Sequence, residues 1–185
     1  MRVIAGKAKR TPLASPKGKN TRPTSDRAKE GLFNIISPRI AETRFLDLFC
    51  GSGAIGIEAL SRGAKHTAFV DHCPRAISSL KLNLEKTGLI QQAWYLCTKV
   101  GLAIEKFAEE GSRYDIIFLD PPYNEGLAAS TLLRIVEAGI LADGGLIVAE
   151  TDTKIIDNIP SSLYLNDVRI YGVTNFLFFE MGQAQ

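Results

Sequence analysis

The sequence predicts an α/β fold with a seven-stranded, mostly parallel sheet. From residue 44 to residue 149, short apolar segments alternate with segments that have the pattern of helices, the order of elements typical of α/β proteins. The apolar segments are nearly continuous, as expected for parallel strands covered on both faces. The last two expected strands, 163–171 and 173–179, are separated only by Gly172, and such a short link permits only an antiparallel hairpin.

Five strands and four helices are expected to alternate in the central part of the chain. The strands are expected at 44–49, 67–70, 93–97, 115–119 and 145–149. The helices are expected at 57–61, 74–86, 102–109 and 127–138. Pro74 is favourable in the first turn of a helix, and Gly63 and Gly88 are placed to end the helices before them.

One more helix is expected before the first strand of this series. Thr24 or Ser25 can cap its start by accepting a hydrogen bond from a free backbone N–H group. Pro38 ends it, because proline cannot continue a helix. Its apolar face is expected to consist of Leu32, Phe33, Ile35 and Ile36.

The first 24 residues are expected to form a basic arm with a short β-hairpin. Arg2–Gly6 has the pattern of a short strand, and Thr11–Ala14 could pair with it across a basic turn. Pro12 would confine the second strand to an edge. With 185 residues the chain is expected to hold one domain. We therefore divide it into an arm at 1–24 and a domain at 25–185.

The charge of the chain is unevenly distributed. Residues 1–30 carry nine Lys and Arg residues against two acidic residues, a net charge of +7. The rest of the chain carries 13 basic and 18 acidic residues, a net charge of −5. A basic arm on a mildly acidic body favours a polyanionic partner, and nucleic acid is the one we expect.

Cysteine and histidine offer little for catalysis or metal binding. Cys50, Cys73 and Cys97 are odd in number and far apart, so neither a disulfide framework nor a zinc site is expected. His66 and His72 are interpreted as structural or surface residues. No apolar run approaches the roughly 20 residues that span a bilayer, and we expect a cytoplasmic, monomeric protein without a metal.

A glycine-rich turn follows the strand at 44–49. Ligands of an open parallel sheet bind at the carboxyl ends of its strands. There the sequence Gly51-Ser-Gly-Ala-Ile-Gly56 lets the backbone approach a ligand closely, and Asp71, 20 residues on, is placed to bind ribose hydroxyls. Asp47 would repel a pyrophosphate but suits the amino group and sulfonium of S-adenosylmethionine (SAM). The expected cofactor residues here are Asp47, Phe49, Gly51, Ser52, Gly53 and Asp71.

Two motifs in this chain resemble those of known methyltransferases. The stretch from Leu46 to Gly56 resembles the first motif of class I SAM-dependent methyltransferases, which have a Rossmann-like fold with a C-terminal antiparallel hairpin. Asp120-Pro-Pro-Tyr123 resembles the motif of members that methylate exocyclic amino groups of bases.

Nearly the whole chain resembles one family, the RsmD family of bacterial guanine-N2 methyltransferases of small-subunit (16S) ribosomal RNA. The most selective sign is the sequence Arg22-Pro-Thr-Ser-Asp-Arg27 before the first strand of the domain. Further signs are Arg2-Val-Ile-Ala-Gly6, Glu58-Ala-Leu-Ser-Arg62-Gly63 and Tyr171-Gly-Val-Thr-Asn175. The resemblance implies 16S rRNA, or the small subunit or its assembly intermediate, as the partner.

The Asp-Pro-Pro-Tyr sequence suits methyl transfer to an exocyclic amine. The Asp120 carboxylate and the Pro121 carbonyl can each accept a hydrogen bond from the NH₂ group, which aims its lone pair and stabilises the positive charge that develops on nitrogen. Pro121 and Pro122 present that carbonyl rigidly, because proline fixes φ and has no N–H group. Tyr123 offers a ring on which the base can stack. Asp120 is expected to adjoin the cofactor as well.

Basic residues of the arm and the selective stretch are expected to bind RNA. These are Lys7, Lys9, Arg10, Lys17, Lys19, Arg22, Thr24 and Arg27. Arg27 is open to two interpretations, pairing with Asp26 or Glu30 or contacting the substrate. Thr98 or a backbone carbonyl is expected to bind the adenine of SAM, because Lys99, at a position where related enzymes carry an acceptor, cannot accept a hydrogen bond.

Three other functions compete with this interpretation. An adenine-N6 or other RNA or DNA amino-methyltransferase would use the same chemistry, but the chain has no sizeable target-recognition domain. An NAD-linked oxidoreductase would have no use for Asp-Pro-Pro-Tyr. A non-catalytic RNA-binding module would not need Asp120 and Tyr123.

Overall fold

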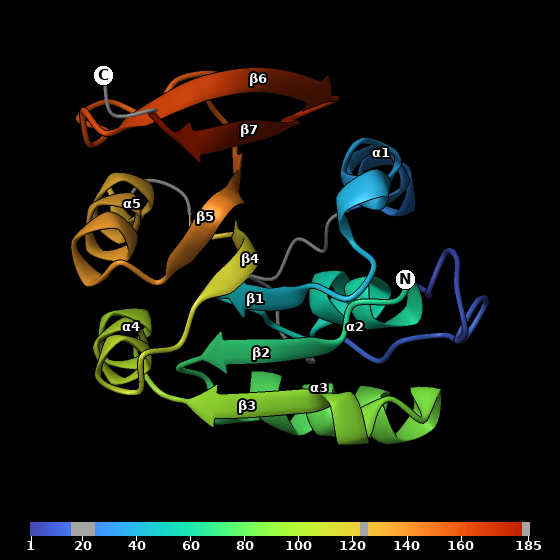
Figure 1. Ribbon diagram of the computed structural model, residues 1–185. Helices are drawn as coiled ribbons and strands as arrows, with labels where there is room; N and C mark the ends of the chain where they lie inside the picture. The colour runs from blue at the N-terminus through green and yellow to red at the C-terminus, as the bar shows by residue number, and fades with distance from the viewer. Residues whose placement is uncertain (16–24, 123–125, 183–185) are drawn as a thin grey trace.

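The computed structural model describes residues 1–15, 25–122 and 126–182. It contains a seven-stranded sheet with the order β3-β2-β1-β4-β5-β7-β6, visible from bottom to top in Figure 1. The first five strands are parallel, while β7 runs antiparallel to both β5 and β6. The strands are β1 (Arg44–Leu48), β2 (His66–Asp71), β3 (Ala93–Cys97), β4 (Tyr114–Leu119), β5 (Leu141–Thr151), β6 (Leu163–Tyr171) and β7 (Thr174–Met181).

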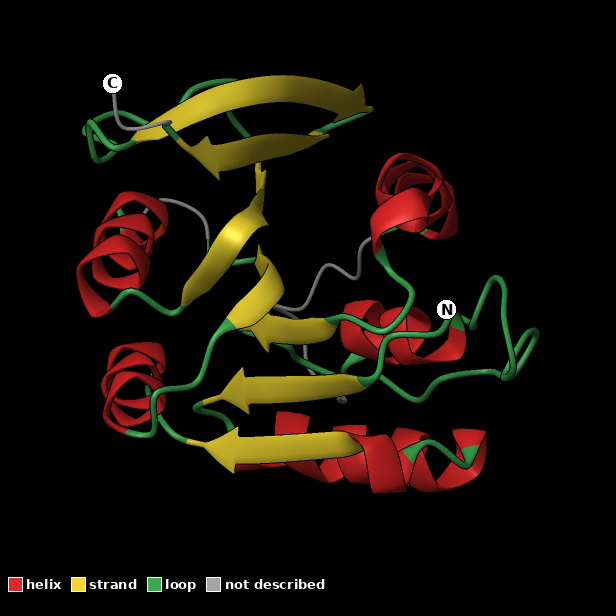
Figure 2. Cartoon of the chain, viewed as in Figure 1, coloured by secondary structure: helices red, strands yellow, loops and turns green. Residues whose placement is uncertain are grey.

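Helices lie on both sides of the sheet (Figure 2). The α-helices are α1 (Asp26–Ile36), α2 (Ala54–Ser61), α3 (Pro74–Thr87), α4 (Val100–Glu109) and α5 (Leu127–Ala138). Short 3₁₀ turns follow α1 at Ser37–Arg39 and precede β3 at Ile90–Gln92. The Ser25 hydroxyl caps α1 by accepting from the Ala28 N–H, and the left-handed Gly88 ends α3, as the sequence predicts.

Two apolar cores sandwich the sheet. One core packs α1, α2 and α3 against residues such as Phe45, Phe69, Phe118 and Val148. The other packs α4 and α5 against Leu46, Val70, Ile117 and Ile147. Neighbouring residues of one strand therefore face opposite cores. Asp120 and Glu150, two positions after Phe118 and Val148, face the side of α1–α3. This alternation decides where the functional side chains project.

The predicted sheet is confirmed, with differences at element ends. The first strand ends at Leu48, since Phe49 has φ 60°, outside the extended region. Helix α2 begins at Ala54, three residues earlier than expected. Strand β5 begins at Leu141, because a register shift against β4 accommodates the turn at Gly144, which reads as a loop in the sequence. None of the helices within the described ranges is long and apolar enough to cross a membrane.

The N-terminal arm pairs with itself and lies on the body of the protein. Arg2 and Pro12 form an antiparallel bridge, and the Val3 N–H donates to the Thr11 carbonyl across 3.0 Å. The pairing is shorter than the expected strands, since Gly6 and Arg10 both have positive φ and turn the chain. Val3, Ala8 and Leu13 are buried in the core on the side of α1–α3.

Candidate active site

The glycine-rich turn (residues 51–56) and the Asp-Pro-Pro corner (residues 120–122) lie at the same edge of the sheet. They follow β1 and β4, which are neighbouring parallel strands with Leu48 opposite Leu119. The Asp120 N–H donates to the Leu48 carbonyl across 3.4 Å, so the sheet pairing continues into the corner. Two motifs about 70 residues apart in sequence are therefore adjacent in space, as the fold rule for parallel sheets predicts.

The glycine-rich turn needs the backbone conformations that glycine allows. Gly51 and Gly53 have φ of 53° and 78°, in the left-handed region that side chains disfavour. A Cβ at Gly53 would lie 2.2 Å from the Leu80 side chain, so the turn packs closely on α3. A Cβ at Gly51 would meet no atom within 4 Å in the described part of the chain. Gly51 thus borders open space, where a ligand can approach the backbone.

Two carboxylates hold this turn in place. Asp71, at the end of β2, accepts from the Gly51 N–H at 2.9 Å and from the Cys73 N–H at 2.8 Å. Asp47, on β1, accepts from the Gly56 N–H at 2.9 Å and so fixes the start of α2. Both predicted cofactor residues therefore have a structural role in the turn, and ligand contact remains a prediction for each.

Burial and neighbouring acids raise the pKa of two carboxyl groups in the site. Asp47 is fully buried, which with Asp71 and Glu150 nearby raises its pKa to about 7 against the effect of the Gly56 hydrogen bond. Burial and the charges of Glu150 and Asp47 also raise the pKa of Asp120. The sequence interpretation missed Glu150, which ends an apolar run in the same way as Asp71 and Asp120.

The Asp-Pro-Pro corner has one accessible and one packed side. Asp120 is half-buried, Pro121 is buried and Pro122 is exposed. Asp120 lies two residues after Phe118 and so projects toward the side of α1–α3, as do Asp47 and Asp71 on their strands. Tyr123, the predicted stacking residue, lies outside the described residues.

The end of β3 completes this edge of the sheet. The Thr98 N–H donates to the Asp71 carbonyl across 3.0 Å, which holds Thr98 beside the turn. Thr98 is half-buried, whereas Lys99 is exposed at the start of α4. Only Thr98 of these two has a side-chain acceptor, and its contact with an adenine amine stays a prediction.

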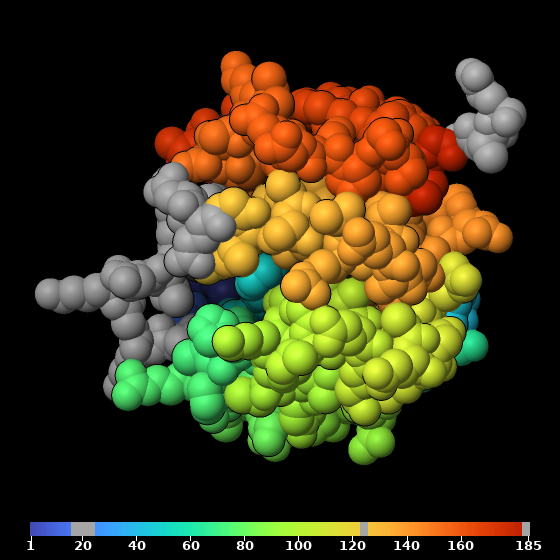
Figure 3. Space-filling model, turned by 90° about the vertical axis from the view of Figure 1, so that its left-hand side faces the viewer, coloured from blue at the N-terminus to red at the C-terminus, as the bar shows by residue number. Residues whose placement is uncertain are grey.

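A hollow opens on the side to which these strand ends point. The arrowheads of β1, β2 and β3 point left in Figure 1, and Figure 3 views that side. It shows a hollow between yellow-green and orange parts of the chain, with a blue to cyan floor. Cavities of about 280 and 320 Å³ lie elsewhere, near Thr43 and Arg44 at the amino ends of the strands.

Part of the basic arm is free to meet a polyanion. Lys7, Lys9 and Arg10 are exposed, as expected for residues that contact RNA phosphates. Arg27 is also exposed and forms no ion pair with Asp26 or Glu30 within the described residues, and its contact with the substrate stays a prediction. The other predicted RNA-binding residues, Lys17, Lys19, Arg22 and Thr24, lie outside the described residues.

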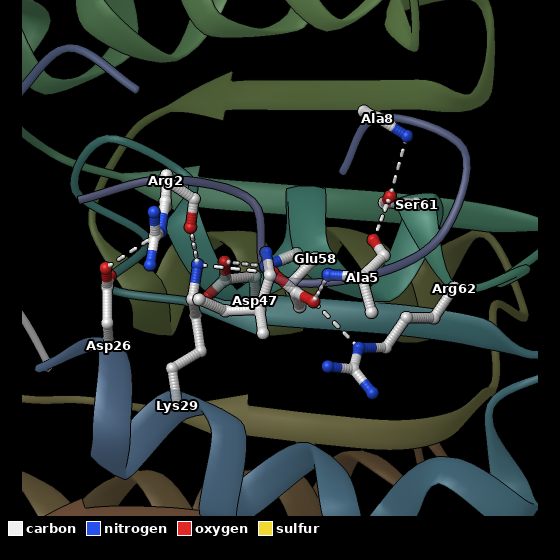
Figure 4. Close-up of polar contacts among 11 residues, drawn as sticks. Arg2, Ala5, Ala8, Asp26, Lys29, Asp47, Glu58, Ser61 and Arg62 are labelled. Atoms are coloured by element: carbon white, nitrogen blue, oxygen red, sulfur yellow. Dashed lines mark hydrogen bonds and ion pairs between the residues drawn. The ribbon is translucent and has the colours of Figure 1, made fainter. Parts of the chain in front are cut away.

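Lys29 is one of the nine basic residues counted over residues 1–30, but it is not available to RNA. It is completely buried on α1, where its Nζ lies 3.2 Å from Oε2 of the equally buried Glu58 and donates to the Arg2 carbonyl at 2.6 Å (Figure 4). Burial lowers the pKa of Lys29, while Glu58 opposes that shift. The buried partner of Lys29 is 29 residues away in sequence, so composition could not reveal it.

The segment Glu58-Ala-Leu-Ser-Arg62 anchors the arm. The Glu58 carboxylate accepts from the Ile4 and Ala5 N–H groups at 2.7 and 3.0 Å and from Arg62 Nε at 2.7 Å. The Ser61 hydroxyl accepts from the Ala8 N–H and donates to the Ala5 carbonyl, as Figure 4 shows. This stretch therefore holds the arm against α2.

Asn83 on α3 links the arm to the glycine-rich turn. Its amide accepts from the Ala14 N–H at 2.8 Å and donates to the Ala14 carbonyl at 2.9 Å. It also donates to the Ser52 carbonyl at 3.0 Å. Asn83 is buried, so one side chain fixes the end of the described arm relative to the turn. The sequence gives no sign of this role.

The chain is similar to known proteins over nearly its full length. The family model described as Conserved hypothetical protein 95 matches residues 1–180. The Bacillus subtilis (strain 168) protein YlbH is 39% identical over 181 residues, which cover 97% of this chain and 98% of that protein. "Ribosomal RNA small subunit methyltransferase D" of Escherichia coli (strain K12) is 32% identical over 97% of this chain and 89% of its own length. The solved structure of the Escherichia coli protein yhhF has a TM-score of 0.85 and 31% identity, covering 98% of this chain and 97% of its own.

Proposed function

The chain belongs to the family described as Conserved hypothetical protein 95, the RsmD family, and we propose that it methylates the exocyclic N2 amine of a guanine in small-subunit ribosomal RNA. Its activity as an rRNA methyltransferase that uses SAM follows from this membership. The identity of the base and the roles of individual residues are our proposal. We place the enzyme in the cytoplasm, with residues 1–24 as the RNA-binding arm and 25–185 as the catalytic domain.

The observation that carries the proposal is the adjacency of the glycine-rich turn and Asp120. The hydrogen bond from the Asp120 N–H to the Leu48 carbonyl joins the two motifs at one edge. A methyl donor held by the turn would therefore lie beside an amine held by Asp120. An NAD-linked oxidoreductase would leave the Asp-Pro-Pro corner without a role.

The residues at this edge fit SAM better than a phosphate-bearing cofactor. Four of the described acidic residues form a cluster at this edge. Besides burial, the charges of Asp71 and Glu150 raise the pKa of Asp47, and the charges of Glu150 and Asp47 raise the pKa of Asp120. A cationic ligand would stabilise this cluster, whereas a pyrophosphate would be repelled. Gly51 offers backbone next to open space, and the Asp71 carboxylate, whose two oxygens each accept one backbone N–H, has further lone pairs that suit a ribose hydroxyl.

When bound, SAM supplies a methyl group on a positively charged sulfur. Asp120 and the Pro121 carbonyl accept hydrogen bonds from the guanine amine and aim its lone pair at that methyl group. Orientation of this kind is worth up to about 7–11 kcal/mol in well-aligned systems. As positive charge develops on the amine nitrogen, the Asp120 carboxylate stabilises it and can take up the proton that is released. Pro121 is buried and rigid, so its carbonyl needs little reorganisation.

RNA would reach this corner through the basic arm. Lys7, Lys9 and Arg10 are exposed for phosphate contacts, and Arg27 is exposed at the start of α1. The Glu58 and Asn83 contacts fix this arm on the body, so the phosphates it binds would have a defined position relative to Asp120. A target guanine in stacked RNA would have to turn out of its stack to enter.

The experiment is methylation of small ribosomal subunits that lack the modification. The protein is incubated with labelled SAM and with these subunits or with the free rRNA, and the labelled nucleotide is then mapped by mass spectrometry. We expect one N2-methylguanine. Label on an adenine or cytosine would refute the guanine assignment, and no transfer to either RNA form would refute the function.

A further inference from the structure

We propose that Glu150 recognises the N1–H group of the target guanine and so selects guanine over the other bases that carry an amino group. This inference rests on the proposed function, since it concerns the base whose amine Asp120 would hold. Glu150 would act as a specificity-determining residue beside Asp120, and the two carboxylates would bind two neighbouring N–H donors of one base.

The sheet places Glu150 beside Asp120. The two residues directly follow Ala149 and Leu119, which face each other in the parallel pairing of β5 and β4. Neighbouring strands lie about 4.8 Å apart, so the backbones of the two acids are separated by about one strand spacing. Their electrostatic interaction, which contributes to the raised pKa of Asp120, agrees with this proximity.

Both acidic side chains project from the same face of the sheet. Phe118 and Val148 lie in the same apolar core, and Asp120 and Glu150 follow each of them by two residues along the strand. Glu150 is 3% exposed, so it lies deeper than the half-buried Asp120. A base that enters past Asp120 would thus meet Glu150 on its inner side.

The chemistry of guanine matches two adjacent acceptors. On its Watson–Crick edge, the ring N1–H and the N2 amine are neighbouring donors. Adenine and cytosine instead carry an acceptor ring nitrogen next to their amine, and a carboxylate facing that lone pair would be repelled. Carboxylates accept and do not donate when ionised. A site built to hydrogen-bond one donor rejects analogues that lack it far better than an apolar pocket can.

The other acids near this edge are less suited to this role. These acids are Asp71 and Asp47. They lie on β2 and β1, on the far side of Asp120 from β5 in the sheet order. Glu150 alone of these acids comes from the strand on the other flank of β4. The methyl donor would therefore lie on the β1 side of Asp120, and the target base on the β5 side.

The test replaces the N1–H donor of the base and the Glu150 acceptor separately. Small-subunit rRNA is ligated from pieces so that the target position carries guanine or 2-aminopurine, and it is used free and assembled with ribosomal proteins. 2-Aminopurine keeps the amine but has an acceptor at N1. Methylation is measured with the wild-type protein, with Glu150→Gln, and with Asp143→Asn as a matched control on the exposed, opposite end of β5.

We expect the wild-type protein to prefer guanine by about 10- to 100-fold in kcat/KM, the range for one hydrogen bond to a charged group. Glu150→Gln should reduce that preference at least about fivefold, because the glutamine amide can donate to N1 of 2-aminopurine. Asp143→Asn should leave it unchanged. The ratio of the two substrates cancels any general loss of folding or SAM binding, which a purely structural role of Glu150 would cause.

Three results would overturn the inference. One is a wild-type protein that methylates 2-aminopurine as fast as guanine, a result that does not depend on any variant folding. Another is equal loss on both RNAs in Glu150→Gln, which would leave Glu150 with a structural role only. In both cases guanine methylation by the wild-type protein would still support the proposed function. Failure to methylate guanine at all would reject the function and the inference together.

Discussion

The backbone N–H of Asp120 donates a hydrogen bond to the carbonyl of Leu48 across 3.4 Å. This bond extends the pairing of β4 and β1 by one residue beyond the strand end. It places the corner that would hold a base next to the turn that would hold the methyl donor. The proposed chemistry depends on this adjacency, because in-line transfer requires both reactants in one site.

Replacement of Asp120 should separate catalysis from binding. In Asp120→Ala, methyl transfer should fall by at least about 100-fold, the size of effect seen when one preorganised electrostatic contact to a transition state is removed. RNA affinity, measured by filter binding, should change little, because the exposed basic arm is intact. Turnover equal to that of the wild-type protein would show that Asp120 does not orient the amine.

SAM binding should become tighter as the pH rises from 5.5 to 7. Burial raises the pKa of Asp47 to about 7, so the group is mostly protonated at pH 5.5 and gains charge toward pH 7. The ligand's α-amino group stays protonated in this range, since its ordinary pKa is about 8. Only the ionised carboxyl attracts a cation, so affinity should rise up to about tenfold over this range, with protons released on binding.

Isothermal titration calorimetry in buffers of different ionisation enthalpy measures that proton release. Asp47→Asn is the matched control, since its amide oxygen can still accept from the Gly56 N–H. It should bind SAM more weakly at pH 7 and with a smaller pH dependence. An affinity that falls with rising pH in the wild-type protein would contradict the role of Asp47.

A methyl group at Gly51 should weaken SAM binding more than folding. A Cβ there meets no described atom within 4 Å, so the main cost to stability of Gly51→Ala is its φ of 53°, about 1–2 kcal/mol. The same Cβ would project from backbone that the ligand approaches, and affinity should fall at least about tenfold. In Gly31→Ala, a Cβ would lie 2.2 Å from the Tyr171 ring, so this control should lose stability without a specific loss of SAM affinity. Thermal unfolding and calorimetry distinguish the two effects.

The buried pair of Lys29 and Glu58 should matter for stability and for the arm. Lys29→Met removes one of the two cations that pair with the buried Glu58 and leaves Arg62 as its ion-pair partner, so the cost should reach at most the about 3–5 kcal/mol of a fully broken buried pair. The double variant Lys29→Met with Glu58→Gln should recover part of that loss, because the buried Glu58 charge is removed together with its buried partner, and the glutamine oxygen can still accept from Arg62. Denaturant unfolding measures each variant. If the double variant loses as much free energy of unfolding as the two single variants together, the pair is not coupled.

The exposed basic residues of the arm should determine the salt dependence of RNA binding. Replacing Lys7, Lys9 and Arg10 by Ala should reduce the slope of log affinity against log salt by about 2–3, since each phosphate contact contributes about 0.7–0.9. The rate at saturating RNA should change little. Lys65→Ala with Lys86→Ala, two exposed positions outside the arm, is the control. An unchanged slope in the arm variant would place the RNA elsewhere.

The sequence predicts the sheet and the placement of the two motifs at one edge of it, because both depend on local patterns. Asp47, Asp71 and Asp120 are found at strand ends because apolar runs mark the strands, and parallel strands place these ends together. Glu150 also follows an apolar run, but it belongs to no recognised motif, so the sequence predicts only a strand end there. The sequence therefore does not assign the end of β5 to the site.

Contacts between distant segments are what the sequence does not predict. Lys29 counts among the basic residues of the segment 1–30, yet its burial against Glu58 depends on how α1 and α2 pack. The link from Asn83 to Ala14 and Ser52 depends on the arm lying across α3, which no local pattern encodes. Charge composition therefore overstates how many cations the segment 1–30 offers to RNA.

A crystal structure of the protein with S-adenosylhomocysteine, the product of methyl transfer, tests the central claim most directly. We predict that its ribose lies against Asp71, its amino acid moiety near the turn at Gly51, and its sulfur toward Asp120. Binding at the opposite edge, in the cavity near Arg44, or with the sulfur directed away from Asp120 would contradict the account.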